Sequence, residues 1–393
     1  MNAPERPLRE SGGAPPAAGP AADRIDLMIV IHSLRGGGAE RVAVDLAAAW
    51  RARGCRVMIV TQTDDRQDAY PLPDGVRRHA LGLAGESAGP LGALWGNLLR
   101  VAALRRLVRR HRPAVVLGMM TRGSVLAVLA ARGRSRVIAT EHAHPPSLPL
   151  PAFWERLRRW TYPRADAVIA LTRGTAQWLD AHLPGVRAQV IPNAVRWPLA
   201  DGEPVLEPPP APGRRRLLAV GRLHPVKGFD GLLRAFAQLA GPFPDWDLTI
   251  LGEGEQRGEL EALRDGLGLA GRVSLPGRVG NMAAWYGASD LYVLSSQAEG
   301  LSNTLIEAMA CGLPCVATDC DTGPREIIRE GLDGLLVRPI DDPDALAAGL
   351  ATLMADAGLR ARLAGRAVDA RDRFGTARIM ALWEQVFQGR RVN

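Results

Sequence analysis

Short apolar runs alternate with helical patterns along the first half of the chain. The runs cover residues 27–31, 57–61, 115–119, 137–140 and 167–171, and each ends in glycine or polar residues. Between the first two, residues 39–50 repeat apolar positions with the period of a helix. Strands that alternate with helices predict a parallel, doubly wound sheet with helices on both faces.

The same alternation starts again in the second half. Residues 197–213 are rich in proline and have no period, which is typical of a semi-rigid linker. Six further strand candidates follow at 217–220, 248–251, 273–275, 291–294, 315–317 and 335–337, and a helical pattern runs from 343 to 388. The sequence therefore predicts an α/β protein of two Rossmann-like domains that face a cleft, with ligands at the carboxyl ends of the strands.

This organisation gives five expected segments. They are a disordered tail at 1–22, an N-terminal domain at 23–196, a linker at 197–214, a C-terminal domain at 215–375, and a last helix at 376–393 that packs back on the N-terminal domain. A chain of 393 residues has the usual size for two domains. No apolar stretch reaches the ~20 residues that cross a bilayer, and residues 1–22 lack the apolar region of a signal peptide.

The four cysteines, Cys55, Cys311, Cys315 and Cys320, do not indicate a metal site or a disulfide framework. They are too few for a framework, and their spacing lacks the paired C-x-x-C clusters of structural zinc sites. We expect small buried thiols in a reducing, cytoplasmic compartment.

A net charge of +8 and a pI near 10.1 indicate anionic partners. Aromatic residues make up only 5% of the chain and no nucleic-acid module is recognisable, so acidic lipid and phosphorylated substrates are favoured over nucleic acid. Residues 98–112 place apolar side chains on one helical face and arginines on the other, and residues 153–160 form a second basic and aromatic cluster. Both segments fit an anionic membrane surface, and both also fit ordinary outer helices of an arginine-rich protein.

The segment 299–314, EGLSNTLIEAMACGLP, carries the most chemical information. It follows a predicted strand, and Ser302 is a suitable N-cap for a helix whose first N–H groups would form a phosphate site. Glu299 precedes this helix and Glu307 lies inside it, where a buried carboxylate needs a partner or a ligand hydroxyl. Either residue alone has an ordinary explanation, but the two together favour a ligand site.

Two other segments place candidate groups at the ends of strands. Arg222 and Lys227 lie in GRLHPVKG, directly after the strand at 217–220, where a phosphate site would need cations. The glycines Gly36, Gly37 and Gly38 follow the first strand and would let the backbone approach a ligand, although the dinucleotide pattern G-x-G-x-x-G is absent. Gly252 and Gly254 fit a tight turn.

Taken together, these residues resemble retaining glycosyltransferases of family 4 with the GT-B fold. The likeness rests on Glu299 and Glu307 with seven residues between them, on Gly221-Arg222 and Lys227-Gly228, on the glycines at 36–38, on Asn193, and on the stretches 323–328 and 334–337. It extends from residue 26 over nearly the whole chain. The TEH and CDTGPREII stretches are similar to members that build surface polysaccharides or lipid-linked oligosaccharides.

The resemblance implies a role for each site residue. Arg222 and Lys227 would hold the donor diphosphate, Glu307 the ribose hydroxyls and Glu299 the donor sugar, and His142 would lie beside the transferred sugar. His142 could also be an ordinary residue at a strand end. The remaining donor contacts would come from Gly36, Gly37, Gly38, Gly221, Gly252, Gly254, Arg278, Gly300, Leu301, Ser302 and Asn303.

The implied activity is transfer of a hexose or N-acetylhexosamine from a UDP-sugar or similar donor to a saccharide acceptor, lipid-linked, at the inner face of the cytoplasmic membrane. We expect no cofactor and no metal, and we interpret Asp319-Cys320-Asp321 as an incidental likeness to a metal-binding D-x-D motif. Two alternatives stay open: a nucleotide-sugar epimerase of the same fold, and a non-catalytic subunit of a polysaccharide assembly complex.

Overall fold

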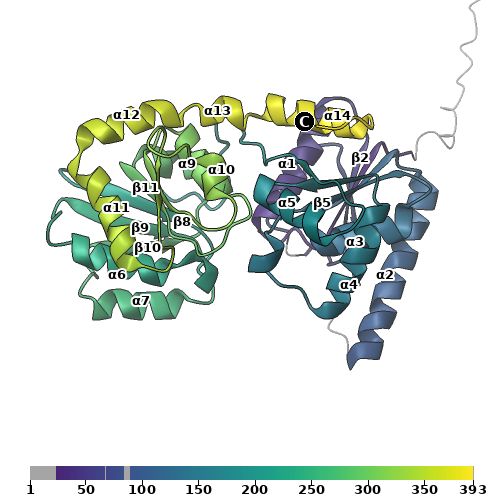
Figure 1. Cartoon of the computed structure of the whole chain (residues 1–393), viewed down its shortest axis with the longest axis horizontal. Helices are drawn as coiled ribbons and strands as arrows, with labels where there is room; N and C mark the ends of the chain where they lie inside the picture. Colours follow the sequence, from purple (N-terminus) through teal and green to yellow (C-terminus); the bar gives the residue numbers. More distant parts are fainter. Residues whose placement is uncertain (1–23, 67, 84–88, 393) are drawn as a thin grey trace, which may run out of the picture.

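The computed structural model describes residues 24–66, 68–83 and 89–392. Two α/β domains lie side by side, each built on one parallel sheet with helices around it (Figure 1). The sequence therefore predicted the fold class correctly. The expected tail at 1–22 lies outside the described residues.

The N-terminal sheet has seven strands in the order β3-β2-β1-β4-β5-β6-β7, and all its pairs are parallel. The strands are β1 (Leu27–Ile31), β2 (Val57–Thr61), β3 (Arg77–Ala80), β4 (Val115–Gly118), β5 (Arg136–Glu141), β6 (Ala167–Ala170) and β7 (Gln189–Val190). Its helices are α1 (Gly38–Ala52), α2 (Gly89–His111), α3 (Met120–Ala131), α4 (Ala152–Thr161) and α5 (Arg173–His182).

Two strands of this sheet, β3 and β7, were not predicted. Both are edge strands, and none of their side chains is fully buried. An edge strand needs no continuous apolar run, because one of its sides faces solvent. The sequence RRHA of β3 therefore carries no apolar strand signal.

The C-terminal sheet has six parallel strands in the order β10-β9-β8-β11-β12-β13. They are β8 (Arg215–Val220), β9 (Trp246–Leu251), β10 (Val273–Gly277), β11 (Leu291–Leu294), β12 (Cys315–Thr318) and β13 (Leu335–Val337). The helices are α6 (Phe229–Leu239), α7 (Arg257–Gly266), α8 (Met282–Gly287), α9 (Asn303–Ala310), α10 (Pro324–Ile327), α11 (Pro343–Ala355) and α12 (Ala357–Ala367). All six predicted strands are present.

Strand β11 illustrates why the central strands are apolar throughout. Leu291 and Val293 join the core under α6 and α11, whereas Tyr292 and Leu294 join the core under α9. Successive side chains of a strand point to opposite faces, so helices on both faces demand apolar residues at every position. Each such side chain contributes about 1.5–3 kcal/mol by leaving water.

The chain returns to the N-terminal domain at its end. After α13 (Ala370–Arg373), helix α14 (Thr376–Phe387) crosses to the N-terminal sheet (Figure 1). Met380 and Trp383 pack in one core with β1, and the ring of Phe387 stacks on Trp50 of α1 at 4.4 Å between centroids. Helix α14 is therefore the last layer of the N-terminal domain.

The segment between the domains contains no helix or strand from residue 196 to 214. It lies along the C-terminal domain, where the carbonyl of Leu206 accepts a hydrogen bond from the Trp285 indole at 2.7 Å, and that of Pro209 accepts one from Arg216 at 2.7 Å. These bonds fix its course over the domain.

The apolar face of residues 98–112 is used inside the fold. Val101, Leu104, Leu107 and Val108 of α2 are buried in one core with the N-terminal sheet. These four side chains are therefore unavailable to a membrane, whereas Leu98 and Leu99, at the start of the stretch, are exposed. Among the residues that the structure describes, no helix combines the length and the apolar character that a bilayer span requires.

Candidate functional site

The loops that follow the strands of both sheets meet between the domains. Gly300, after β11, touches the backbone of His142, after β5: a Cβ at this glycine would lie 2.1 Å from the His142 carbonyl oxygen. On the other side, Gly36 after β1 faces the guanidinium of Arg278 after β10. The predicted residues of both domains are thus brought to one region.

Lys227 and Glu299 form the central pair of this region. The Lys227 ammonium donates to Glu299 Oε1 at 2.5 Å, and Ser296 donates to the same oxygen at 2.7 Å. Both charged side chains are mostly buried, with 22% and 10% of their surface exposed. Lys227 is also the only lysine in a chain that has 49 lysines and arginines in total.

The loop that carries Lys227 is held by the loops beside it. Ser295 Oγ donates to the Lys227 carbonyl at 2.8 Å, and Gln297 N donates to the Val226 carbonyl at 2.9 Å. Gly252, with φ +137°, passes so close to the Gly221 carbonyl that a Cβ would lie 1.8 Å from its oxygen. Only glycine fits there, so Gly252 acts in packing the two loops together.

Arg222 differs from Lys227 in its surroundings. Its side chain is exposed, and no ion pair to it occurs within residues 24–66, 68–83 and 89–392. It lies five residues before Lys227, at the carboxyl end of β8. The guanidinium is therefore available to an anion in the cleft.

The first turn of α9 begins as the sequence predicted. Ser302 is its N-cap and accepts a hydrogen bond from Leu305 N at 3.4 Å. Leu301 and Ser302 are buried, and the amide oxygen of Asn303 accepts a bond from Asn193 of the N-terminal domain at 2.9 Å. Asn193 therefore ties the two domains together at this helix.

Glu307 has partners that the sequence did not identify. Its carboxylate, which is buried, pairs with Arg41 of α1 at 2.9 Å and accepts a hydrogen bond from the Tyr286 hydroxyl at 3.1 Å. Burial raises the pKa of Glu307 above its usual value, and Arg41 opposes that shift. In the sequence, Arg41 directly follows Glu40 within a predicted helix. Nothing in the helical pattern indicates that Arg41 pairs with a residue of the other domain.

His142 lies half-buried at the end of β5. Its Nε2 is 2.9 Å from Thr140 Oγ1, and burial lowers the pKa of its imidazole to about 4. The ring is therefore neutral at pH 7. With Asn193 and Trp383 it lines a mainly apolar cavity of about 380 Å³ between α1, α14 and the sheet.

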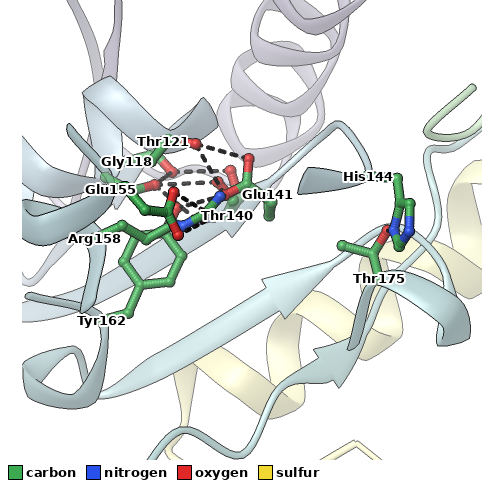
Figure 2. Close-up of polar contacts among 10 residues, drawn as sticks. Gly118, Thr121, Thr140, Glu141, His144, Glu155, Arg158, Tyr162 and Thr175 are labelled. Carbon is green, nitrogen blue, oxygen red and sulfur yellow. Dashed lines mark hydrogen bonds and ion pairs between the residues drawn. The ribbon is translucent and has the colours of Figure 1, made fainter. Parts of the chain in front are cut away.

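Glu141, which directly precedes His142 in the chain, is the centre of a buried polar network (Figure 2). Both carboxylate oxygens of Glu141 accept from Thr121 Oγ1 at 2.9 Å, one also accepts from Tyr162 at 3.0 Å, and Arg158 lies 3.5 Å away. Arg158 in turn donates to Glu155 at 2.7 Å. The network joins β5 to α3 and α4, so it fixes the strand end that carries His142.

The remaining candidate groups have ordinary roles. Asp319 pairs with Arg325 and Arg338. Burial raises the pKa values of Cys311 and Cys320 to about 12, and Cys315 is fully buried. These three thiols are therefore protonated at neutral pH.

Comparison with protein families gives two matches that together cover most of both domains. Residues 36–196 match the family described as Glycosyltransferase Family 4, and residues 214–356 match the family described as Glycosyl transferases group 1.

Three curated relatives illustrate the sequence similarity. The phosphatidyl-myo-inositol mannosyltransferase of Mycolicibacterium smegmatis is 34% identical over 67% of this chain and 68% of its own. An N-acetylgalactosaminyltransferase of Campylobacter jejuni, named for a diphospho-undecaprenol acceptor, is 28% identical over 85% of this chain and 91% of its own. The exopolysaccharide phosphotransferase SCO2592 of Streptomyces coelicolor is 33% identical over 79% of this chain.

The chain spans only 32% of the length of that Streptomyces protein, and 48% and 65% of two further relatives.

Solved structures match over almost the whole chain. Sucrose-phosphate synthase of Thermosynechococcus elongatus superimposes with a TM-score of 0.80 at 20% identity, covering 93% of this chain and 98% of its own. HepE of Anabaena, solved with UDP and glucose, gives 0.76 at 21%, covering 93% and 100%.

Proposed function

Because the chain belongs to glycosyltransferase family 4 and has the GT-B fold, we propose that it transfers a glycosyl group from a nucleotide-diphosphate sugar to a saccharide acceptor. One observation carries the proposal: Lys227 and Glu299 form a buried pair at the edge of the C-terminal sheet, beside the exposed Arg222 and the start of α9. The backbone of His142, in the other domain, touches Gly300 of the loop that carries Glu299.

The cations and helix N–H groups suit the charge that the reaction develops. The bond between C1 of the sugar and the phosphate oxygen breaks, and its electron pair leaves with the nucleoside diphosphate. Arg222, Lys227 and the first N–H groups of α9 would stabilise that negative charge, and each charge-assisted hydrogen bond contributes about 1.5–3 kcal/mol. In this proposal no metal ion takes part.

Glu299 and Glu307 would position the donor. The Glu299 carboxylate is held by Lys227 and Ser296, so a sugar hydroxyl can donate to its second oxygen without reorganisation of the loop. Glu307 would accept from the ribose hydroxyls. Since Arg41 and Tyr286 already contact that carboxylate, donor binding would require Arg41 to share or leave it.

His142 would contact the transferred sugar as a neutral imidazole. Its lowered pKa keeps one nitrogen free to accept a hydrogen bond at physiological pH. We assign no protein nucleophile. The acceptor hydroxyl would form its bond to C1 on the face that the phosphate leaves, its proton would pass to the departing phosphate oxygen, and the anomeric configuration would be retained.

The substrates are proposed from the names of similar proteins. HepE binds UDP and glucose, and the Campylobacter relative is named for a diphospho-undecaprenol acceptor. We therefore propose a UDP-sugar as donor, carrying a hexose or N-acetylhexosamine, and a lipid-linked saccharide as acceptor. The product would be part of a bacterial surface polysaccharide, made on the inner face of the cytoplasmic membrane.

An exposed apolar surface on the N-terminal domain supports peripheral attachment. Trp95 and Leu98 of α2 have 64% and 53% of their surface exposed, and Phe153 and Trp160 of α4 are exposed as well. Both helices lie at the lower right of the N-terminal domain in Figure 1. Exposed tryptophan and leucine beside arginines suit the interface of an anionic bilayer.

Release of nucleoside diphosphate tests the proposed transfer. The protein would be incubated with a panel of nucleotide sugars and with membrane lipid extract, together with Lys227→Ala, Glu299→Ala and the control Glu259→Ala on the surface of α7. We expect release with one donor, dependent on lipid, at least 100-fold slower in the first two variants and unchanged in the control. This size of loss corresponds to about 2.7 kcal/mol.

Other outcomes identify the alternatives. A new sugar isomer formed without acceptor would identify an epimerase. If no donor caused release and none stabilised the protein against heat, that result would contradict transfer and favour a non-catalytic subunit.

Attachment is tested separately by vesicle co-sedimentation. Trp95→Glu combined with Leu98→Glu should abolish binding to the vesicles, and Leu332→Glu, at an exposed site of the C-terminal domain, should not. Equal binding by both variants would contradict attachment through α2.

A further inference from the structure

Arginines lie at the first residue of, or just before, the strands of the N-terminal sheet along its amino edge. All its strands are parallel, so the residues where they begin line up on one edge of the sheet. In sheet order from β2 to β7 these are Arg56, Arg24, Arg112, Arg136, Arg164 and Arg187. Five strand spacings separate the first from the last, about 24 Å. We call this row the basic edge.

Most of the basic edge borders one groove of about 1660 Å³. Its lining includes nine arginines and a single acidic residue, Asp166. The formal charge of this lining, +8, equals the net charge of the entire chain, so the rest of the molecule is neutral on balance. A smaller cavity of about 180 Å³ shares Arg136 and continues to Arg187, Arg390 and Arg391.

The acidic groups near the groove already have partners. Asp166 accepts a hydrogen bond from Val137 N at 2.7 Å, and Asp26 pairs with Arg56 at 3.0 Å. In contrast, Arg109, Arg112, Arg132 and Arg134 are exposed and form no ion pair within the part of the chain that the structure describes. Like charges crowded in one concavity repel one another until an anion enters.

Arg112 shows that the backbone alone does not explain an arginine here. It follows the last residue of α2 with φ +43°, and its N–H bonds to the Val108 carbonyl at 2.9 Å. Glycine is the usual residue in this left-handed position, and a side chain there costs about 1–2 kcal/mol. Arg112 therefore adds a charge to the groove at a cost to the fold.

We propose that the groove is a binding site for an anion that carries several phosphate groups. Guanidinium groups bind phosphate oxygens through two parallel hydrogen bonds, and the lining offers few apolar side chains, so charge would dominate recognition. The site lies at the amino edge of the sheet, whereas the cleft lies at the carboxyl ends of its strands. It is therefore separate from the donor site and does not depend on the proposed transfer.

Calorimetric titration of the full chain with tripolyphosphate tests the site. The groove variant carries Arg112→Gly, Arg132→Ala and Arg134→Ala. The matched control carries Arg234→Ala, Arg362→Ala and Arg378→Ala, which remove the same charge from exposed positions of α6, α12 and α14. We expect about tenfold or more weaker binding in the groove variant and less than about twofold change in the control.

Two further arms complete the test. Arg112→Gly alone should weaken binding while the melting temperature stays the same or rises, which separates binding from unfolding. Vesicles of cardiolipin, whose headgroup carries two phosphate groups, distinguish the phosphate source: a groove variant that no longer binds the vesicles identifies a lipid headgroup, and one that loses only tripolyphosphate binding identifies a soluble anion. Equal binding of both probes by the groove variant and the control would overturn the proposal.

Discussion

A lysine at position 227 is notable in a chain that otherwise uses arginine for every basic side chain except histidine. The side chain of Lys227 packs against Gly221: a Cβ on Gly221 would lie 3.4 Å from both Cδ and Cε of the lysine. The only side-chain nitrogen, Nζ, donates to Glu299. A planar guanidinium is wider and spreads its charge over three nitrogens. The compact ammonium of lysine suits this single contact with Glu299 better than a guanidinium does.

Lys227→Arg should consequently lower kcat about tenfold or more although the charge is kept. The measurement is steady-state release of nucleoside diphosphate, with Arg222→Lys as the reverse exchange. Arg222 is exposed and forms no ion pair within the described residues, so a lysine there keeps the charge without disturbing a buried pair, and Arg222→Lys should lower kcat less than Lys227→Arg does. Full activity in Lys227→Arg would show that charge alone matters at this position.

His142 should stay neutral far into the acid range. Burial lowers its pKa from 6.5 to about 4, so the unfolded chain binds the proton first as the pH falls. The free energy of unfolding should therefore decrease from pH 6.5 to 4 through this group, and less so in His142→Gln. NMR titration of the imidazole checks the pKa; a midpoint near 6.5 would contradict it.

Glu141→Ala should destabilise the protein by about 3–5 kcal/mol, because it leaves Arg158 and Tyr162 buried without their shared carboxylate. Glu155→Ala is the matched control: Glu155 contacts the same arginine but is less buried. Urea unfolding followed by circular dichroism measures both. Equal losses would mean that Glu141 has no special position in the network of Figure 2.

At the scale of elements, the loops after the strands decide how the domains meet. Gly300 lets the loop before α9 touch the His142 carbonyl, and Glu326 of α10 accepts from the Arg173 N–H at the start of α5 at 2.7 Å. These contacts join the carboxyl-end loops of one sheet to those of the other.

Gly300→Ala should therefore impair transfer by at least about tenfold with little change in melting temperature. The new methyl group would lie 2.1 Å from the His142 carbonyl oxygen, so the two loops must separate. Gly258→Ala in α7 is the control, because a Cβ there meets nothing within 4 Å. Equal activities of the two variants would contradict this role of Gly300.

Some helices, strands and contacts could be predicted from the sequence, and others could not. Central strands such as β11 are covered on both faces, so their continuous apolar runs predicted them. Ser302 predicted the start of α9, because its hydroxyl can cap a helix. Edge strand β3 carried no such run. The pairing of Arg41 with Glu307 was unpredictable, because it depends on how two separately folded domains dock.

At the scale of the whole molecule, Arg41 helps to hold the domains together in the absence of donor. Its pair with Glu307 crosses the cleft at 2.9 Å, and the Asn193–Asn303 hydrogen bond crosses it nearby. Ribose hydroxyls at Glu307 would compete for the same carboxylate. Closure and donor binding are therefore expected to be linked.

Arg41→Gln should increase the radius of gyration measured by small-angle X-ray scattering without donor, and addition of the donor should reverse the increase. Arg53→Gln is the control, since Arg53 pairs with Glu384 of α14 on the N-terminal side alone. An unchanged radius in Arg41→Gln without donor would mean that the other contacts suffice for closure.

The single lysine also provides a spectroscopic reporter inside the cleft. Reductive methylation with ¹³C-formaldehyde would label Lys227 Nζ and the terminal amine, and no other side chain of this sequence. The Lys227 signal would then report the ionisation of that amine and its contact with Glu299 directly, in the intact chain and with donor added. Because every other basic side chain is arginine or histidine, the signal of Lys227 Nζ can be followed without overlap from other side-chain amines.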